Sequence, residues 1–204
     1  MTESMTVQII NQISKEKPGN VFSWKDFAIQ DIQTKTVVKN LSRLKKKNII
    51  KSVGNFRGLY YKPKINPLIG LVPPSEKEII KAYEKKLNTH FYVSGANAAN
   101  ILGLSTQIPS KTVYYTNKQI KPLFINKKEI LFKRKKLNYS QKQNASLLLL
   151  LSIEYLGKNE VNNKKTKEKI LKILNNKCIF SNINNNLKYF PKWITEYIEE
   201  NIIG

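Results

Sequence analysis

The stretch that most constrains the fold is residues 34–61, where a helical pattern is followed at once by a hairpin pattern. Apolar residues recur at helical spacing and predict one buried face: Val37, Val38, Leu41 and Leu44. The polar and basic residues are expected largely on the other side: Lys35, Thr36, Lys39, Asn40, Ser42 and Arg43. Asn48 is expected to end the helix, because asparagine tolerates the left-handed conformation found at helix C-termini.

Two short strands, 49–53 and 59–61, are expected after this helix. The connection between them contains Gly54 and Gly58, which supply the positive φ angles that a tight hairpin needs. A donor-rich helix followed by a basic-tipped hairpin is the layout of a winged helix-turn-helix. Its helix enters the major groove of DNA and its wing contacts the backbone or the minor groove. An ordinary amphipathic helix beside a solvated hairpin fits the same residues.

The charge of the chain indicates a polyanionic partner. Lys+Arg is 36 against an Asp+Glu of 14, and the formal net charge of +22 suits DNA, RNA or an anionic membrane surface. Lysine, asparagine and isoleucine are abundant, which indicates AT-rich coding and makes the arginines more informative. Arg43 lies in the predicted helix and Arg57 at the tip of the predicted wing. The rigid guanidinium fork suits guanine edges and phosphates better than an ammonium does.

Several classes of site and location are excluded by residue usage. Cys178 is the only cysteine and His90 the only histidine, which excludes an internal disulfide, a thiolate zinc cluster and a two-histidine metal site. The most apolar run, 145–153, is shorter than the roughly 20 residues that span a bilayer. The N-terminus lacks a basic-then-apolar signal. We expect a cytoplasmic protein with no metal, no cofactor and no membrane partner.

Prolines at 63, 67, 73 and 74 mark the expected domain boundary. The predicted domains are a winged helix-turn-helix at 1–62, a linker at 63–74 and an α+β domain at 75–204. The aliphatic residues of the linker are expected to pack on a surface. The predicted fold class is therefore α+β, with an N-terminal winged helix-turn-helix followed by a domain with a small antiparallel sheet and C-terminal helices.

The second domain is expected to open with a helix capped by Ser75. A small-residue helix over 94–103 is predicted to lie against a sheet. That sheet is predicted to be an antiparallel meander of three strands: 112–116, 123–125 and 130–134. Three further helices are expected, at 144–156, 164–174 and 191–202, with a polar loop at 182–186.

Several short stretches occur together in an order that resembles a known family. They are Val21-Phe22-Ser23 with Asp26-Phe27, Leu41-Ser42-Arg43-Leu44, Arg57-Gly58-Leu59-Tyr60, Ser94-Gly95-Ala96 through Asn100, the run 102–109, and Val113-Tyr114-Tyr115-Thr116. With these stretches the chain resembles the AbiEi-type antitoxins of bacterial type IV toxin–antitoxin, or abortive-infection, systems. The similarity covers about residues 5–135, and 94–116 is its most specific part.

The resemblance implies a function. Such antitoxins have an N-terminal winged helix that binds promoter repeats and represses their own operon. Their C-terminal domain counters a nucleotidyltransferase-like toxin without forming a stable complex with it. The expected partners are thus double-stranded DNA and a toxin that is not stably bound. We expect a monomer in solution and several copies on DNA. The compact C-terminal region departs from the longer members of the family, which leaves a stand-alone transcriptional regulator as an alternative.

The candidate DNA-binding residues fall in two groups. The first comes from the predicted helix and wing: Lys35, Thr36, Lys39, Asn40, Arg43 and Arg57. The second is a later basic run, with Lys127 and Lys128 nearby: Lys133, Arg134, Lys135 and Lys136. This run suits a second phosphate contact, and it equally suits a solvated strand edge on which lysines discourage aggregation.

Catalysis is not expected. Ser94 precedes a predicted helix, where a serine is usually a cap, and His90 is the only histidine that a serine nucleophile could use as a base. A basic RNA-binding protein remains an alternative, although the predicted strands lack the exposed aromatic pairs of an RNA-recognition sheet.

Overall fold

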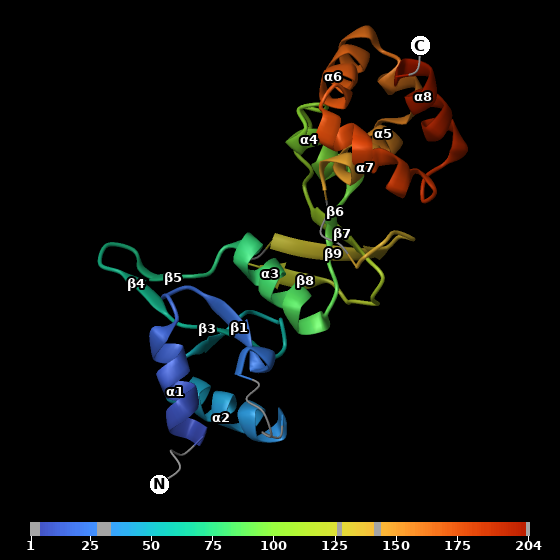
Figure 1. Ribbon diagram of the computed structural model, residues 1–204. Coiled ribbons are helices and arrows are strands. Elements are labelled where there is room, and N and C mark those ends of the chain that lie inside the picture. The colour runs from blue at the N-terminus through green and yellow to red at the C-terminus, as the bar shows by residue number, and fades with distance from the viewer. Residues whose placement is uncertain (1–4, 28–33, 126–127, 141–143, 203–204) are drawn as a thin grey trace. The chain divides into compact units, whose positions relative to one another are not determined.

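The fold is mixed α+β (Figure 1). The computed structural model describes residues 5–27, 34–125, 128–140 and 144–202. The chain divides into two compact units, which we call unit 1 (Met1–Asn88 with Leu123–Lys127) and unit 2 (Thr89–Pro122 with Lys128–Gly204). Small antiparallel sheets and a helical C-terminal part confirm the coarse fold class expected from the sequence. None of the helices in the described ranges is long and apolar enough to cross a bilayer.

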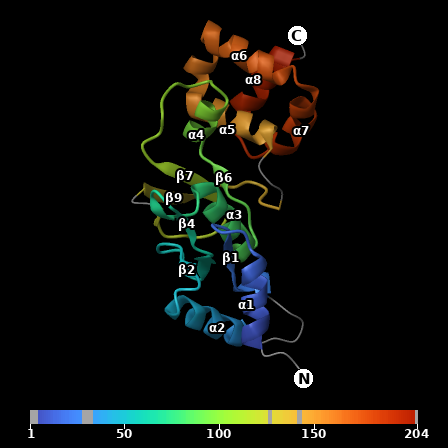
Figure 2. The same ribbon diagram turned by 90° about the vertical axis from the view of Figure 1, so that its left-hand side faces the viewer.

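Unit 1 is built around a three-stranded antiparallel sheet of order β1-β3-β2. Its elements are α1 (Met5–Lys15), β1 (Val21–Ser23), the 3-10 helix η1 (Trp24–Phe27), α2 (Thr34–Lys46), β2 (Lys51–Ser52), β3 (Leu59–Tyr61), β4 (Lys64–Asn66), β5 (Gly70–Val72), α3 (Glu76–Leu87) and β8 (Leu123–Ile125). The helices α1 and α2 lie on one side of the sheet and α3 lies on the other (Figures 1 and 2).

The core between α1, α2 and the sheet follows from the predicted apolar spacing. It contains Ile9, Ile13, Phe22, Phe27, Val37, Leu41, Leu44 and Ile50. The helix α2 ends as expected, because Asn48 has a φ of +57° and the Ile49 N–H donates to the Leu44 carbonyl at 3.1 Å. The β2–β3 connection also has the predicted positive φ angles, +40° at Gly54 and +73° at Gly58.

The division into units differs from the predicted domain boundary. Ser75 and Glu78 do form a capping box at the start of α3. However, α3 belongs to unit 1 and not to the second domain. Its apolar residues Ile79 and Ile80 are buried, and the Tyr83 ring meets Phe56 of the β2–β3 connection at a centroid distance of 5.2 Å. The helix therefore covers the second face of the N-terminal sheet.

The predicted linker at 63–74 forms a hairpin, and its aliphatic residues do not pack on a surface. The strands β4 and β5 pair with each other, and Ile65, Leu68 and Ile69 are each at least three-quarters exposed. The hairpin extends away from the helices of unit 1 (Figure 1). A two-stranded ribbon offers no second layer in which to bury side chains.

Unit 2 combines a small sheet with a helical layer. Its elements are β6 (Tyr92–Val93), α4 (Gly95–Ile101), β7 (Thr112–Thr116), β9 (Lys128–Arg134), α5 (Ala145–Val161), α6 (Lys164–Leu174), α7 (Lys177–Leu187) and α8 (Lys192–Ile202). The strand β7 lies between β6 and β9, antiparallel to β6 and parallel to β9. The predicted antiparallel meander is therefore wrong. In a meander the strand at 123–125 would separate β7 from β9, whereas β7 pairs directly with β9 from Thr112 to Thr116.

Two helical predictions for unit 2 also need correction. The small-residue helix α4 packs against α5 and not against a sheet. The two helices approach so closely at Gly95 that a Cβ there would lie 2.5 Å from the Leu151 carbonyl oxygen. The predicted polar loop 182–186 is part of α7. Ile179, Ile183 and Leu187 recur at helical spacing in that segment and contribute to the unit 2 core.

Candidate nucleic-acid interface

The exposed side of α2 carries a continuous basic surface. We call it the α2 face and define it by six exposed residues: Lys35, Val38, Lys39, Ser42, Arg43 and Lys46. They recur three or four positions apart, so they share one side of the helix. Among the residues that the structure describes, no acidic side chain forms an ion pair with these cations. The α2 face therefore presents positive charge to solvent.

Lys46 and Val38 are the residues of this surface that the sequence interpretation missed. Lys46 follows Lys39 at a two-turn spacing, a signal already present in the sequence. Val38 was expected on the buried side but is 42% exposed. It lies about 100° around the helix from the buried Val37. An apolar side chain thus lies within an otherwise polar surface.

Asn40 is placed differently from the prediction. Its side chain is buried, at 5% exposure, and its Nδ2 donates to the Thr36 carbonyl at 3.1 Å. Thr36 itself is half-buried. Of the five predicted residues in α2, the structure therefore brings Lys35, Lys39 and Arg43 together on the exposed face and leaves Thr36 at its edge.

Arg57 is exposed, but the loop that carries it is held in place. The Phe56 ring packs on Tyr83, and the Asn55 Oδ1 accepts a hydrogen bond from the Phe124 N–H at 3.0 Å. The Lys86 Nζ donates to the Arg57 carbonyl. Burial lowers the pKa of Lys86, and the nearby charge of Lys25 lowers it further. The predicted wing is therefore a fixed loop attached to α3 and β8.

The second basic run is not uniformly exposed. Lys133, Arg134 and Lys136 are exposed. The side chain of Lys135 is 19% exposed, and its Nζ lies 2.8 and 2.7 Å from the two carboxylate oxygens of Glu154. The same ammonium lies 5.7 Å from the Tyr115 ring centroid and 5.2 Å from that of Phe190.

Lys135 thus connects the end of β9 to α5 through this ion pair. The sequence interpretation had given it as a phosphate contact, whereas its position is that of a structural residue. Burial, and then the charge of Glu154, raise the pKa of Tyr115 beneath it. Lys128 is exposed at the start of β9, and Lys127 lies outside the described residues. The run belongs to unit 2, whereas the α2 face belongs to unit 1.

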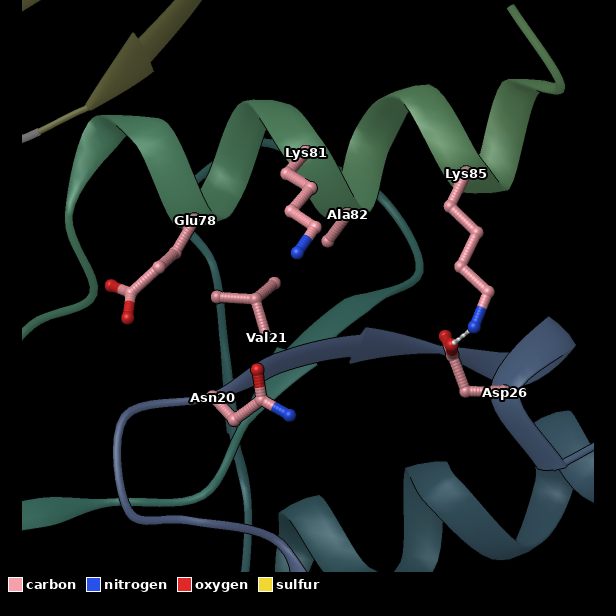
Figure 3. A pocket seen from close by; sticks show the side chains of 7 residues that line it. All are labelled: Asn20, Val21, Asp26, Glu78, Lys81, Ala82 and Lys85. Carbon is pink, nitrogen blue, oxygen red and sulfur yellow. Dashed lines mark hydrogen bonds and ion pairs between the residues drawn. The ribbon is translucent and has the colours of Figure 1, made fainter.

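A pocket of about 380 Å³ lies between β1 and α3. Figure 3 shows its lining, which includes two carboxylates and two ammonium groups. The Asp26 carboxylate accepts from the Ser23 N–H at 2.7 Å and pairs with Lys85. Hydrogen bonds from Ser75 lower the pKa of Glu78. Both lining carboxylates are engaged by neighbouring donors: the Ser23 N–H and Lys85 for Asp26, and Ser75 for Glu78.

Ser94 and His90 are the two residues that the sequence singled out when catalysis was considered. Ser94 precedes α4 in the extended conformation of an N-cap, but its side chain makes no capping hydrogen bond to that helix. His90 is half-buried. Within the part of the chain that the structure describes, histidine, cysteine and carboxylate side chains do not gather in groups of three or more that could hold a metal.

Residues 8–181 match a family of unknown function, DUF6088. The chain belongs to this family. The matched segment includes the α2 face, the β2–β3 loop and the basic run at the end of β9, and it stops before α8. A comparison with curated proteins gave no match.

Proposed function

We propose that this DUF6088 protein binds double-stranded DNA through the α2 face. The observation that carries the proposal is the set of exposed cations on one side of α2, surrounding a small apolar side chain. Clustered cations supply the salt-sensitive attraction to phosphates. Side chains on an exposed helix face can also reach base edges in the major groove. The formal net charge of +22 favours the same class of partner.

The order of elements in unit 1 supports a winged helix-turn-helix. The described order is α1, β1, η1, α2, β2 and β3, and β3 lies between β1 and β2 in the sheet. In this proposal α2 is the recognition helix and the β2–β3 loop is the wing. The segment before the recognition helix consists of η1 and residues 28–33, and the latter lie outside the described ranges.

The cations of the α2 face and Arg57 have different proposed roles. Lys35, Lys39 and Lys46 contact phosphates as mobile point charges. Arg43 donates to the O6 and N7 acceptors of a guanine. Arg57, on its fixed loop, contacts a phosphate beside the site.

The physiological role that we propose rests on the resemblance to AbiEi-type antitoxins. In this role the protein represses its own operon and counters a nucleotidyltransferase-like toxin without a stable complex. A chain in which Lys35, Lys39 and Arg43 are changed to glutamine should lose repression. It should still rescue cells from a toxin encoded beside it, if antitoxicity resides in unit 2. Loss of rescue together with repression would assign antitoxicity to repression itself.

The DNA-binding proposal is tested by titrating the full chain into duplex DNA from the region upstream of its own gene. A random duplex and a structured RNA serve as competitors. The variant Lys35→Gln/Lys39→Gln/Arg43→Gln should lose at least about a hundredfold in affinity, since each good contact contributes about 1–3 kcal/mol. The matched control, Lys164→Gln/Lys165→Gln/Lys172→Gln, removes the same charge from exposed positions of α6. Equal affinities of the two variants would overturn the proposal.

RNA binding is the second candidate, and one observation favours it. Tyr114 and Phe132 lie side by side in register on β7 and β9, with ring centroids 6.1 Å apart and planes at 25°. Such a pair can stack nucleobases of single-stranded RNA. The sequence interpretation missed this pair because it depends on the parallel register. Both rings are half-buried, and Phe91 already meets the Phe132 ring at 5.1 Å. The RNA competitor in the same titration separates the two candidates.

A further inference from the structure

The β4–β5 hairpin is a well-defined element. Ile65 lies opposite Leu71 and Asn66 lies opposite Gly70. The Asn66 Oδ1 accepts hydrogen bonds from the Leu68 N–H at 2.8 Å and the Ile69 N–H at 3.2 Å, which closes the turn. The tip is therefore held by its own hydrogen bonds and presents its side chains in a fixed arrangement.

This hairpin exposes a cluster of large aliphatic side chains to solvent. The exposed fractions are 77% for Ile65, 93% for Leu68, 75% for Ile69 and 40% for Leu71. Single exposed aliphatic residues are common, but contiguous apolar patches on soluble proteins usually mark an interaction site. Residues 65–74 also contain no charged side chain, in a chain that is 25% charged.

The backbone of the hairpin is also available for pairing. Within the described ranges, β4 and β5 form a two-stranded sheet with no third strand. Each strand therefore has an outer edge of N–H and C=O groups that a further strand can pair with. An isolated hairpin is only marginally stable in water, so added pairing would stabilise it.

We propose that the β4–β5 hairpin is a self-association surface through which two copies of this chain form a symmetric dimer. A strand edge that meets its own copy across a two-fold axis is automatically antiparallel and self-complementary. The charge distribution favours a second copy over a polyanion, because Lys64 at the start of β4 is the one charged residue of the hairpin and 65–74 offers no cation to a phosphate. It also makes this segment a surface where copies with a net charge of +22 approach with little local repulsion.

The size of the hairpin sets the strength of the dimer. Stable protein interfaces bury at least about 1,200 Å² in total, and a short ribbon with four exposed aliphatic side chains offers less. The dimer should therefore be weak and reversible, and dilute protein should be monomeric. The expectation of a monomer in solution then holds only at low concentration.

The affinity of the proposed dimer should depend on salt concentration in a characteristic direction. Added salt screens the repulsion between two strongly basic copies and leaves apolar contacts intact. Dimerisation should therefore tighten as salt rises, whereas any association through complementary charges should weaken. This dependence is opposite to that expected for DNA binding.

The test is sedimentation equilibrium of the full chain without DNA, over a concentration series that reaches hundreds of micromolar at low and high salt. The variant Leu68→Lys should weaken dimerisation at least about tenfold, because the dimer would bury an unpaired charge. The matched control is Ile108→Lys, which makes the same charge change at an aliphatic residue outside the hairpin that is 86% exposed. Circular dichroism should report unchanged folds, since both side chains face solvent.

Three outcomes would overturn the proposal. They are a chain that stays monomeric at every concentration and salt, a dimer that Leu68→Lys and Ile108→Lys affect equally, and a dimer that weakens as salt rises. A hairpin that serves a different protein would give the first outcome. Because no DNA is present, none of these results bears on the DNA-binding proposal, and the two can fail separately.

Discussion

The α2 face and the basic run at the end of β9 have similar compositions and different structural environments. On α2, Lys35, Lys39 and Arg43 are exposed on one side of a helix. At the end of β9, exposed residues flank one residue that is bound within the structure. Lys135 is bound to Glu154, while its neighbour Lys136 is exposed.

The difference shows that a count of charged residues does not reveal which of them face solvent. Spacing on a helix decides which residues share a face, so a long helix gathers its cations on one surface. A short run at a strand end directs successive side chains to different surroundings. The same residue type is then a solvent-facing group in one place and an internal ion-pair partner in the other.

The largest effect is expected at Lys135. Lys135→Met should lower the free energy of unfolding by about 2–3 kcal/mol, because it leaves the half-buried Glu154 carboxylate without its partner. Lys136→Met, on the adjacent exposed residue, should change it by no more than about 0.5 kcal/mol. Urea unfolding of both variants measures the difference. Equal free energies of unfolding for the two variants would mean that the Lys135–Glu154 ion pair does not stabilise the fold.

The exposed members of the run provide the next test. Lys133→Gln/Arg134→Gln/Lys136→Gln leaves the Lys135 ion pair intact. Each residue that contacts a phosphate should contribute about 0.9 to the salt slope of log K, so the slope should fall while the preferred DNA sequence stays the same. Titrations at several salt concentrations measure this. An unchanged slope would identify the run as a solvated strand edge, and changed base preference would place it at the bases instead.

A smaller effect, of about 1 kcal/mol, is expected at Val38. If this exposed side chain contacts a thymine methyl group, replacing that thymine by uracil should weaken binding about fivefold for the wild-type chain. Val38→Ala should bind the thymine duplex as weakly and show no further loss with uracil. This double-mutant cycle isolates one methyl contact from the phosphate contacts around it. Independent, additive losses would show that Val38 and the methyl group do not meet.

Local signals predicted much of the fold from the sequence. The cap at Ser75, the left-handed Asn48 and the burial of Val37, Leu41 and Leu44 depend on residues close in sequence, and these predictions are confirmed. The winged-helix assignment and the candidate DNA contacts stay predictions.

The missed features depend on residues far apart in the chain. The assignment of α3 to unit 1 depends on β1 and Phe56, and the parallel β7–β9 pair depends on where the chain re-enters the sheet. The ion pair of Lys135 depends on Glu154 of α5. At 63–74 the aliphatic composition suggested burial, whereas Asn66 and Gly70 close a turn that leaves those residues exposed.

The smallest effects are expected within α2, where a buried polar residue can be compared with an exposed one. Asn40 and Ser42 are polar residues two positions apart, and only Ser42 is on the α2 face. Asn40→Ala removes the hydrogen bond to the Thr36 carbonyl and a buried amide, and it should cost about 1 kcal/mol of folding free energy. The affinity for DNA should stay within about twofold, because the lost group points into the protein. Ser42→Ala should show the reverse pattern, with unchanged stability and a loss in affinity of no more than about 1 kcal/mol. Parallel unfolding and binding measurements decide the matter. A variant of Asn40 that is stable yet binds poorly would mean that the Asn40 amide turns outward on DNA. Asn40 would then belong to the α2 face.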